Sequence, residues 1–513
     1  MRLFLHVLVL LSGVVSLGAE LGASRLLAPY FGTSLVVWSS LIGLILVALA
    51  VGYWLGGKWA DRSPKWESLL SVELGAGTML ALLPLVAAPV LERALLDLGH
   101  LQIGMLLGTF AGVLVLLGAP MVLMGCITPF AIKLATTQMD EAGRVAGRLF
   151  ALSTIGSFLG AFLPTVFLIP LMGTRWTFTT FALVLLTLAL VGYLLRSNWK
   201  MAGVTLLSVA LAVGIGLFMS SRPIKPGPGV VFEKESPYQY IRVVERPNGW
   251  FWLHLNEGLV VHSKYHPEKM LSYGEWDYVA LSPFLGKAKS DPSTKAKSWA
   301  VIGAGAGTTA RIVSYFWGKD AWIHGVELDP DVVDVGKRFF GADLPNYQVD
   351  VNDGRAWLKT NDNSYDVVSI DAYRQPYIPF ELTTVEFFQE VMDHLNEDGV
   401  AVINVSRPPK DMRLVNALAT TMAEVFPSVH LMHLPDTSMV TLIFGTKAET
   451  TLEDYRANLV KADRRFAPLL RKIRDRVGDH YDRSIVLTDD HAPVERLMDL
   501  MLVAQALDGH WLE

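Results

Sequence analysis

The sequence predicts a chain in two parts: a seven-span bundle of transmembrane helices, followed by an α/β domain with a doubly wound, Rossmann-like sheet. Apolar runs recur up to residue 220 and account for a mean hydropathy of +0.36. Ser220 to Gly229, SSRPIKPGPG, is a proline- and glycine-rich break. After it, short apolar runs alternate with helical segments, as in a parallel sheet with crossover helices.

We expect four segments. Residues 1–222 form the transmembrane bundle and 223–229 form a linker. Residues 230–295 hold a small β element and a lead-in helix, and 296–513 form the α/β domain. The net charge of −5 argues against bulk binding of nucleic acid. The only cysteine, Cys126, excludes a disulfide framework and a cysteine metal site, and we expect no metal.

Seven apolar runs are long enough to cross a bilayer, which takes about 20 residues. Glycine pairs at four-residue spacing, such as Gly52 and Gly56, let helix backbones pack closely in lipid. The runs lie near residues 3–22, 35–57, 68–90, 102–124, 147–172, 176–195 and 201–219.

Basic residues in the short loops are asymmetric, which predicts the orientation. The rich side, predicted to be cytoplasmic, carries Arg2, Lys58, Arg62, Lys65, Lys133, Arg144, Arg148, Arg196 and Lys200. The other side carries Arg25, Arg93 and Arg175. With seven spans, the C-terminal part then lies outside the cytoplasm of a multi-pass protein of the cell membrane.

Two acids, Glu20 and Glu73, stand in apolar runs, and Arg25 follows the first closely. Charges in lipid are costly and are usually paired or face water. One interpretation is a polar pocket near the membrane surface. The other is a Glu20–Arg25 pair that fixes helix packing.

The segment after the linker begins with three alternating runs that read as an antiparallel β element. They are Val230–Phe232, Tyr240–Glu245 and Phe251–Leu255, with a Pro-Asn-Gly turn at 247–249 between the last two. Trp276–Leu285 is predicted to be the helix that leads into the α/β core.

The α/β domain then alternates strands with helices, so its ligand site is expected at the carboxyl ends of the strands. The predicted strands are Trp299–Ile302, Trp322–Val326, Tyr347–Val349, Val367–Ile370, Val400–Val405, His430–Leu434 and Val440–Phe444. The predicted helices are Thr308–Phe316, Asp331–Phe340, Arg355–Lys359, Thr384–Leu395 and Met412–Val425, with more helices in 452–513.

A glycine-rich turn joins the first of these strands to its helix. Gly303, Gly305 and Gly307 let the backbone turn sharply and approach a ligand closely. Glu327 ends the second strand, where a carboxylate accepts hydrogen bonds from both hydroxyls of a ribose. Strand, glycine turn, helix, strand and acid together predict a nucleoside-containing cofactor.

Two further acids follow strands. Asp353, next to Gly354, is placed to meet an adenine amino group, although a helix cap explains it nearly as well. Asp371 ends the fourth strand, where it can hold or deprotonate a nucleophile. The segment Glu235–Tyr240, ESPYQY, adds Gln239 and two tyrosines before the core.

At these residues the chain resembles the polyamine aminopropyltransferases, spermidine synthase and its relatives. The matching pieces are ESPYQYIRV, the glycine loop, VELDP, NDGRAW, YDVVSIDAY and TVEFF, over about residues 233–405. The membrane part resembles multi-spanning bacterial proteins fused to such a domain. LGASRLLAPYFG, GYWLGGKWADR, GRVAGRLFALSTIGSFLGAF and TDDHAPVE carry this second resemblance.

The resemblance implies a fold like that of S-adenosylmethionine methyltransferases and transfer of an aminopropyl group from decarboxylated S-adenosylmethionine to a diamine such as putrescine. It makes Asp371 and Tyr373 the catalytic residues. The implied cofactor-binding residues are Gln239, Gly303, Gly305, Gly307, Glu327, Asp353 and Gly354. The candidate substrate-binding residues are Tyr238, Asp277 and Asp490.

Three positions depart from the family pattern. Ala306 replaces an acid of the glycine loop, and the catalytic loop reads Asp371-Ala372-Tyr373-Arg374 without its second acid. A tyrosine-histidine-glutamate segment appears here as Trp276-Asp277-Tyr278. Two alternatives therefore stay open: a methyltransferase using S-adenosylmethionine, and a non-enzymatic module that senses or transports a polyamine or nucleoside.

The predicted partners are a small amine acceptor and the lipid bilayer, without nucleic acid; a homo-oligomer is left open. Basic-residue counting places the α/β domain outside the cytoplasm. Cofactor supply argues for the cytoplasm, because adenosyl sulfonium compounds are made in the cytosol.

Overall fold

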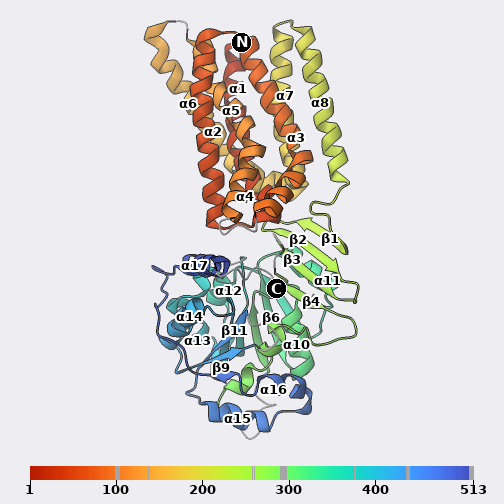
Figure 1. Cartoon of the computed structure of the whole chain (residues 1–513), viewed down its shortest axis with the longest axis vertical. Coiled ribbons are helices and arrows are strands. Elements are labelled where there is room, and N and C mark those ends of the chain that lie inside the picture. Colours follow the sequence, from red (N-terminus) through yellow and green to blue (C-terminus); the bar gives the residue numbers. More distant parts are fainter. Residues whose placement is uncertain are drawn as a thin grey trace. The chain divides into compact units, whose positions relative to one another are not determined.

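The computed structural model describes residues 1–98, 104–136, 138–256, 258, 260–288, 297–374, 377–434 and 439–507. It divides into two compact units, and each is described by itself (Figure 1). The first unit comprises Met1–Pro228, Glu233–Ile241 and Leu255–Gly258. The second comprises Gly229–Phe232, Arg242–His254 and the chain from Leu259 onward.

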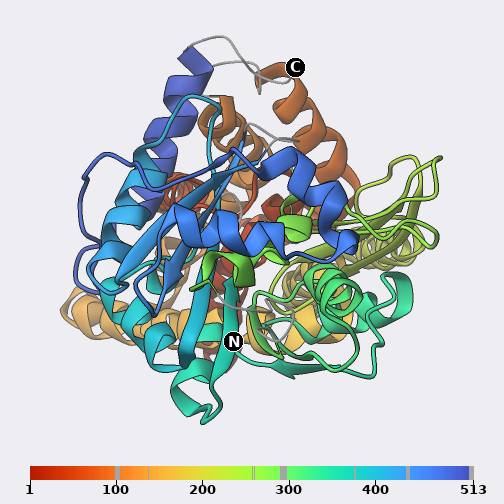
Figure 2. The same cartoon turned by 90° about the horizontal axis from the view of Figure 1, so that it is seen from below.

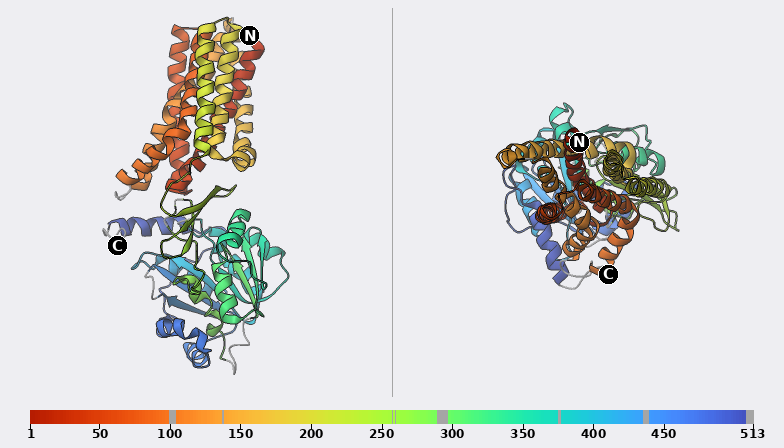
Figure 3. Two further views of the ribbon diagram at one scale, coloured as in Figure 1. Left: turned by 90° about the vertical axis from the view of Figure 1, so that its right-hand side faces the viewer. Right: turned by 90° about the horizontal axis from the view of Figure 1, so that it is seen from above.

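The first unit is a bundle of long apolar helices lying side by side (Figure 3). The α-helices are α1 (Arg2–Phe31), α2 (Leu35–Arg62), α3 (Trp66–Leu98), α4 (Gly104–Val113), α5 (Ala119–Ala135), α6 (Ala142–Phe162), α7 (Ile169–Leu195) and α8 (Trp199–Ser220). Short π or 3₁₀ turns precede α5, α6 and α7: η1 (Leu114–Gly118), η2 (Met139–Glu141) and η3 (Leu163–Leu168).

Within the described residues, 6 helices are long and apolar enough to cross a membrane, where the sequence predicted seven. The difference lies in Ala142–Leu195, a 54-residue stretch that combines two predicted spans into one continuous helical run. The helix geometry breaks once inside it, at Gly173, whose φ of 78° and ψ of 169° are not helical. The predicted spans 3–22, 35–57, 68–90 and 201–219 each fall within one helix: α1, α2, α3 and α8. The predicted span 102–124 begins outside the described residues, and its described part covers α4, η1 and the start of α5.

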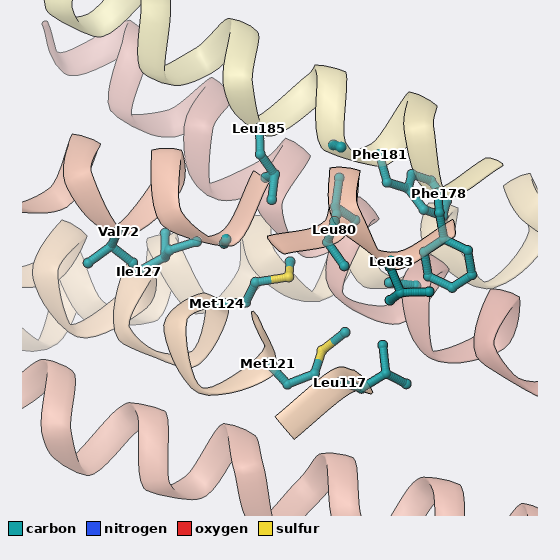
Figure 4. Close-up of a cluster of buried hydrophobic side chains, with 14 of the residues drawn as sticks. Val72, Leu80, Leu83, Leu117, Met121, Met124, Ile127, Phe178, Phe181 and Leu185 are labelled. Carbon is teal, nitrogen blue, oxygen red and sulfur yellow. The ribbon is translucent and has the colours of Figure 1, made fainter. Parts of the chain in front are cut away.

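Glycines bring two pairs of helices into backbone contact. A Cβ on Gly52 of α2 would lie 2.2 Å from the carbonyl oxygen of Val122 on α5, and one on Gly156 of α6 would lie 2.0 Å from that of Leu10 on α1. Larger side chains at these positions would separate the helices. Between them lies an apolar core, part of which is shown in Figure 4 with Met121, Met124 and Phe181.

Polar contacts at one end of the first unit fix the start of the predicted linker. Arg175 donates to the carbonyl oxygens of Met219 and Pro223, both at 2.8 Å, and so caps the end of α8. The carboxylate of Glu235 accepts from the backbone N–H and hydroxyl of Thr174 at 2.8 and 2.7 Å. The start of the predicted linker is therefore held by specific hydrogen bonds, although its sequence has no helix or strand pattern.

Four strands form an antiparallel element in the order β1-β2-β3-β4. They are β1 (Val230–Glu235), β2 (Tyr240–Glu245), β3 (Phe251–Leu255) and β4 (Ser263–Tyr265). The first three match the predicted runs, whereas β4 was not predicted because three residues carry too little periodicity. The predicted lead-in helix is split into α9 (Glu275–Val279) and a 3₁₀ turn, η4 (Ser282–Leu285), since Pro283 cannot continue an α-helix.

The α/β sheet has the order β12-β10-β11-β9-β8-β5-β6-β7 among the described residues. Its strands are β5 (Ser298–Ile302), β6 (Trp322–Glu327), β7 (Tyr347–Val351), β8 (Tyr365–Ile370), β9 (Leu395–Ser406), β10 (Ser428–His433), β11 (Val440–Thr446) and β12 (Val477–Gly478). Strands β5 to β9 are parallel, as predicted for a Rossmann-like fold.

The purely parallel sheet expected from the sequence is wrong at one edge, where β11 runs antiparallel to both β9 and β10. The connection from β10 to β11 is too short for a crossover, which needs a dozen or more residues, so the two strands pair as a hairpin.

Helices cover both faces of this sheet (Figure 2). Alternate residues of one strand serve opposite layers: Ala300 and Ile302 pack on one side, Trp299 and Val301 on the other. The first side is covered by α12 (Gly354–Thr360), α13 (Val385–Asp393), α14 (Arg413–Ala423) and α17 (Val494–Leu507). The second is covered by α9, η4, α10 (Thr308–Trp317), α15 (Leu452–Val460), η7 (Arg464–Phe466) and α16 (Ala467–Ile473). The remaining α/β elements are α11 (Pro330–Phe339) and the 3₁₀ turn η6 (Phe380–Leu382).

Candidate active site

The candidate site lies where the sheet order reverses, between β5 and β8. From β5 the chain adds β6 and β7 to one side, whereas β8 and β9 lie on the other. Such a switch point separates the loops at the carboxyl ends of the two strands and creates a ligand crevice. A Cβ on Gly303, which follows β5, would lie 2.5 Å from the carbonyl oxygen of Asp371, which follows β8. The glycine loop and the predicted catalytic acid are therefore neighbours.

The glycine loop has the backbone geometry that its sequence predicts. Gly303, Gly305 and Gly307 have φ values of 81°, 53° and 85°, which residues with a side chain rarely adopt. Strand β4 supports the loop from outside the motif, because Ser263 Oγ accepts the backbone N–H of Ala306 at 3.0 Å. The three glycine conformations and the hydrogen bond to Ser263 fix the loop next to the N-terminus of α10. We call this loop, residues 303–307, the glycine cradle.

Glu327 supports the same loop from the second strand. Its Oε2 accepts the backbone N–H of Gly305 at 2.9 Å, and its Oε1 accepts that of Asp329 at 3.1 Å. A carboxylate oxygen has a second lone pair, so each can still accept a hydroxyl hydrogen. Burial raises the pKa of Glu327 to about 7, although both backbone bonds favour its charged form.

Asp353 is exposed and caps α12, with Oδ1 accepting the backbone N–H of Arg355 and Ala356 at 3.1 and 2.9 Å. This is the helix-cap interpretation left open from the sequence. Gly354 is the first residue of that helix, and a Cβ there would lie 2.5 Å from the side chain of Ile302 on β5. The glycine thus allows α12 to approach the sheet.

Asp371 accepts hydrogen bonds at both carboxylate oxygens. The indole Nε1 of Trp276 donates to Oδ2 at 3.1 Å, and the amide of Asn404 donates to Oδ1 at 2.8 Å. Burial, and then the nearby negative charge of Glu275, raises the pKa of Asp371 to about 7. An acid held between two donors and titrating near neutrality suits a general base.

Tyr373 does not present a free hydroxyl. Its O–H donates to the carbonyl oxygen of Asn404 at 2.9 Å and accepts the backbone N–H of Ser406 at 2.8 Å. Burial raises the pKa of this hydroxyl above its ordinary value. The side chain ties the loop after β8 to the end of β9, next to Asp371.

The other predicted residues are distributed more widely. Asp277 is buried, and its carboxylate accepts the backbone N–H groups of Ser272 and Tyr273 at 2.8 Å each. Its pKa is raised to about 6 by burial. Asp490 is exposed in a turn after the sheet. Tyr238 and Gln239, in the turn between β1 and β2, lie in the first compact unit and are described only within it.

The structure adds residues that the sequence interpretation missed. Glu275, at the start of α9, stands close enough to Asp371 to raise its pKa, and burial raises its own. Lys264 of β4 lies 5.8 Å from the centroid of the Trp276 ring and favours the charged form of Glu275. Two carboxylates and one lysine therefore influence one another electrostatically at this site, and Glu275 and Lys264 come from elements outside the loop after β8.

A usable signal existed for two of these. Asn404 is a polar residue inside the apolar run Val400–Val405, and a polar group buried in a strand needs a specific partner. Glu275 directly precedes Trp276, the start of a segment already identified as a departure from the family pattern. No local pattern indicated Lys264.

Comparison with known proteins agrees with this chemistry. The profile of the Spermine/spermidine synthase domain matches residues 286–454. A protein from Bifidobacterium longum named "Probable polyamine aminopropyl transferase" is 29% identical over 316 residues, covering 56% of this chain and 68% of its own length. Polyamine aminopropyltransferase 1 from Aquifex aeolicus is 27% identical, over 39% of this chain and 69% of its own.

Among solved structures, spermidine synthase from Thermotoga maritima is 22% identical, covering 53% of this chain and 88% of that protein, with a TM-score of 0.36. The profile match over residues 286–454 and the similarity to polyamine aminopropyltransferases support a transferase enzyme with a spermidine-synthase-type domain.

Proposed function

We propose that this protein is a membrane-integrated aminopropyltransferase that acts on decarboxylated S-adenosylmethionine and an amine acceptor such as putrescine. The observation that carries the proposal is Asp371, held beside the glycine cradle by Trp276 and Asn404 with a pKa near 7. The similarity to polyamine aminopropyltransferases supports the reaction class.

The residues present fit an adenosyl sulfonium cofactor. Gly305 has a φ of 53°, and a Cβ there would lie 3.0 Å from Ser263 Oγ, so a glycine suits the loop at this distance from β4. Glu327, at the end of the second strand, has remaining lone pairs for the ribose hydroxyls, and Asp353 stands at the third strand for the adenine. When bound, the cofactor supplies an electrophilic carbon next to a sulfonium, with a neutral thioether as the leaving group.

In this reaction the protein must remove a proton from the acceptor amine and orient its nitrogen toward the electrophilic carbon. An ammonium has no lone pair, so Asp371 takes its proton, and the nitrogen lone pair then forms the new N–C bond as the C–S bond breaks. The hydrogen bonds from Trp276 and Asn404 orient the carboxylate and favour its ionised form, which opposes the rise of its pKa. We assign Tyr373 a positioning role because its hydroxyl is bound to β9.

We propose that Glu275 supplies the second negative charge that a diamine requires. A charged carboxylate binds an ammonium through charge-assisted hydrogen bonds. Lys264 favours the charged form of Glu275. Arg374 is exposed, and its positive charge favours the charged form of Glu495.

We propose that the first unit crosses the membrane seven times. A straight helix of 54 residues would measure about 81 Å at about 1.5 Å per residue, against a hydrocarbon core of about 30 Å. Both α6 and α7 pack against α1, and the backbone breaks at Gly173, near the start of α7. These observations support a reversal inside Ala142–Leu195 and therefore two crossings.

The decisive experiment uses the full chain purified in detergent. It is incubated with putrescine and either decarboxylated S-adenosylmethionine or S-adenosylmethionine, and the products are identified by mass. A gain of one aminopropyl group on putrescine supports the proposal. Methylated putrescine would show that the protein transfers a methyl group instead. If the cofactor binds but a range of amine acceptors stays unmodified, the result would favour a sensor.

A further inference from the structure

The first unit contains a cavity that the proposed reaction does not use. It has a volume of about 400 Å³, within the range of small-molecule sites. It lies among the start of α1, the end of α5 and the start of α6. We call it the basic cavity; its lining residues are Arg2, Leu5, His6, Ala135, Glu141, Arg144, Val145, Arg148 and Leu149.

The charges of the basic cavity are unbalanced. Glu141 is its one carboxylate, and this group forms an ion pair with Arg144. Neither Arg2 nor Arg148 has an ion pair with a carboxylate in the part of the chain that the structure describes. Two guanidinium groups therefore face the same space without a counter-charge from the protein.

The chemistry of these groups selects a ligand class. A guanidinium is always charged, and its planar set of N–H donors matches two oxygens of a phosphate. An anion that bridges Arg2 and Arg148 would supply the missing counter-charge. Lysine pairs with phosphate as a point charge only, so arginines indicate geometric recognition.

The surroundings of the cavity favour a lipid headgroup over a free anion as its ligand. Leu5 and Leu149 are almost fully buried and form an apolar wall next to the charged groups. Arg2 is the first residue of α1, and Arg148 lies in the first two turns of α6; both helices belong to stretches apolar enough to cross a membrane. A ligand with a phosphate attached to apolar chains can bind the arginines and pack against the apolar wall, whereas inorganic phosphate can bind only the arginines.

We propose that the basic cavity binds the phosphate group of an anionic phospholipid. The inference rests on the membrane placement in the proposed function, but not on the transfer reaction. The site lies on the side rich in basic residues, where an anionic headgroup is attracted most strongly.

The test compares two double variants of the full chain in detergent. Arg2→Gln with Arg148→Gln removes the two unpaired arginines. Arg62→Gln with Lys65→Gln is the matched control, because it removes the same charge from exposed positions outside the cavity. Each protein is mixed with phosphatidylglycerol or phosphatidylcholine, and bound lipid is counted by native mass spectrometry.

We expect the parent and the control to retain phosphatidylglycerol in preference to phosphatidylcholine. The Arg2/Arg148 variant should need about tenfold more phosphatidylglycerol for the same occupancy, the effect of losing charge-assisted hydrogen bonds. Equal retention by all three proteins would overturn the site. Displacement of the lipid by inorganic phosphate at equal concentration would overturn the lipid as the ligand.

Two further readouts separate this inference from the proposed function. Carbonate extraction of membranes shows whether each protein is integral, and product formation from putrescine shows whether the α/β domain works. A protein that is integral and active but shows no lipid preference contradicts the basic cavity alone. A protein released by carbonate contradicts the membrane placement on which the cavity proposal rests.

Discussion

The indole of Trp276 and the carboxylate of Asp371 are joined by a hydrogen bond of 3.1 Å from Nε1 to Oδ2. The two residues lie 95 positions apart, one in α9 and the other after β8. This bond favours the charged carboxylate, whereas burial and the charge of Glu275 favour the protonated acid. The balance between them sets the pH at which Asp371 becomes a base. The hydrogen bond from Trp276 and the charge of Glu275 can each be removed by a single substitution.

Trp276→Phe keeps an aromatic side chain and removes the N–H donor. Because the lost bond stabilised the charged form, the pKa of Asp371 should rise further. The rate of product formation, which increases as Asp371 loses its proton, should then reach its half-maximum at a higher pH than in the parent. A pH–rate profile of kcat/KM measures this shift, and an unmoved acid limb would contradict the role of the indole.

Glu275→Gln should act in the opposite direction. Removing the neighbouring negative charge makes ionisation of Asp371 easier, so the acid limb of kcat/KM should move to lower pH. A diamine should also bind less tightly, with a KM about tenfold higher for the loss of a charged hydrogen bond. Glu268→Gln, at an exposed position, is the charge-matched control. Shifts of the same sign in Trp276→Phe and Glu275→Gln would rule out the proposed electrostatics.

The βα units explain why the core of this site was predictable. Gly303 and Asp371 each follow a strand and Glu327 ends one, and a parallel sheet brings the carboxyl ends of its strands to one edge. Their order along the chain therefore indicated their meeting in space. Glu275 and Lys264 reach the same place from elements outside that sheet, and no periodicity specifies how a separate element docks.

The same limit applies to the assigned roles. Asp277 and Asp353 were chosen for their charge, and in the structure their carboxylates accept backbone N–H groups of their own turn or helix while keeping lone pairs for a ligand. Acids in turns favour such local bonds, and only coordinates distinguish a cap from a ligand contact. Tyr373 was predicted to be catalytic beside Asp371, and in the structure its hydroxyl is hydrogen-bonded to the backbone of β9.

Asp371→Asn keeps the size of the side chain and removes the base. We expect the turnover rate to fall by about 10²–10⁴-fold, the usual contribution of general base catalysis. Asp362→Asn, at an exposed position, should leave the rate unchanged. Turnover at the parent rate would exclude Asp371 as the base.

The same substitution changes how stability depends on pH. The pKa of Asp371 in the folded state, about 7, lies above its ordinary value of 3.8. Folding therefore gains from this group at low pH, and the gain disappears as the pH rises through about 7. Asp371→Asn removes that dependence, so the ligand-free variant should have a higher Tm than the parent at pH 8 and a smaller difference at pH 5. Differential scanning calorimetry at both pH values checks the sign.

Glu327→Gln should weaken binding of the adenosyl cofactor by about 1–3 kcal/mol, measured by calorimetry. The structure adds a complication, because Glu327 also holds the backbone N–H of Gly305. Ser263→Ala provides the control, since it removes another hydrogen bond of the loop, to Ala306, from outside the predicted ribose contact. Equal losses in the two variants would mean that Glu327 acts through the loop only.

Cysteine labelling tests the number of spans and the orientation together. Lys65 lies between α2 and α3, and Lys319 lies between α10 and β6; both are exposed. Seven crossings put these positions on opposite sides of the membrane, and six put them on the same side. The native Cys126 is buried in the bundle and gives the background.

We predict that Lys319→Cys reacts with a membrane-impermeant reagent in intact cells and that Lys65→Cys reacts only after lysis, because basic loops stay in the cytoplasm. The reverse pattern would keep seven crossings and place the transferase domain in the cytoplasm, where its cofactor is made. If both cysteines behave alike, the number of crossings is even. Gly173 would then bend Ala142–Leu195 without returning the chain across the bilayer, and the proposal of seven spans would fail.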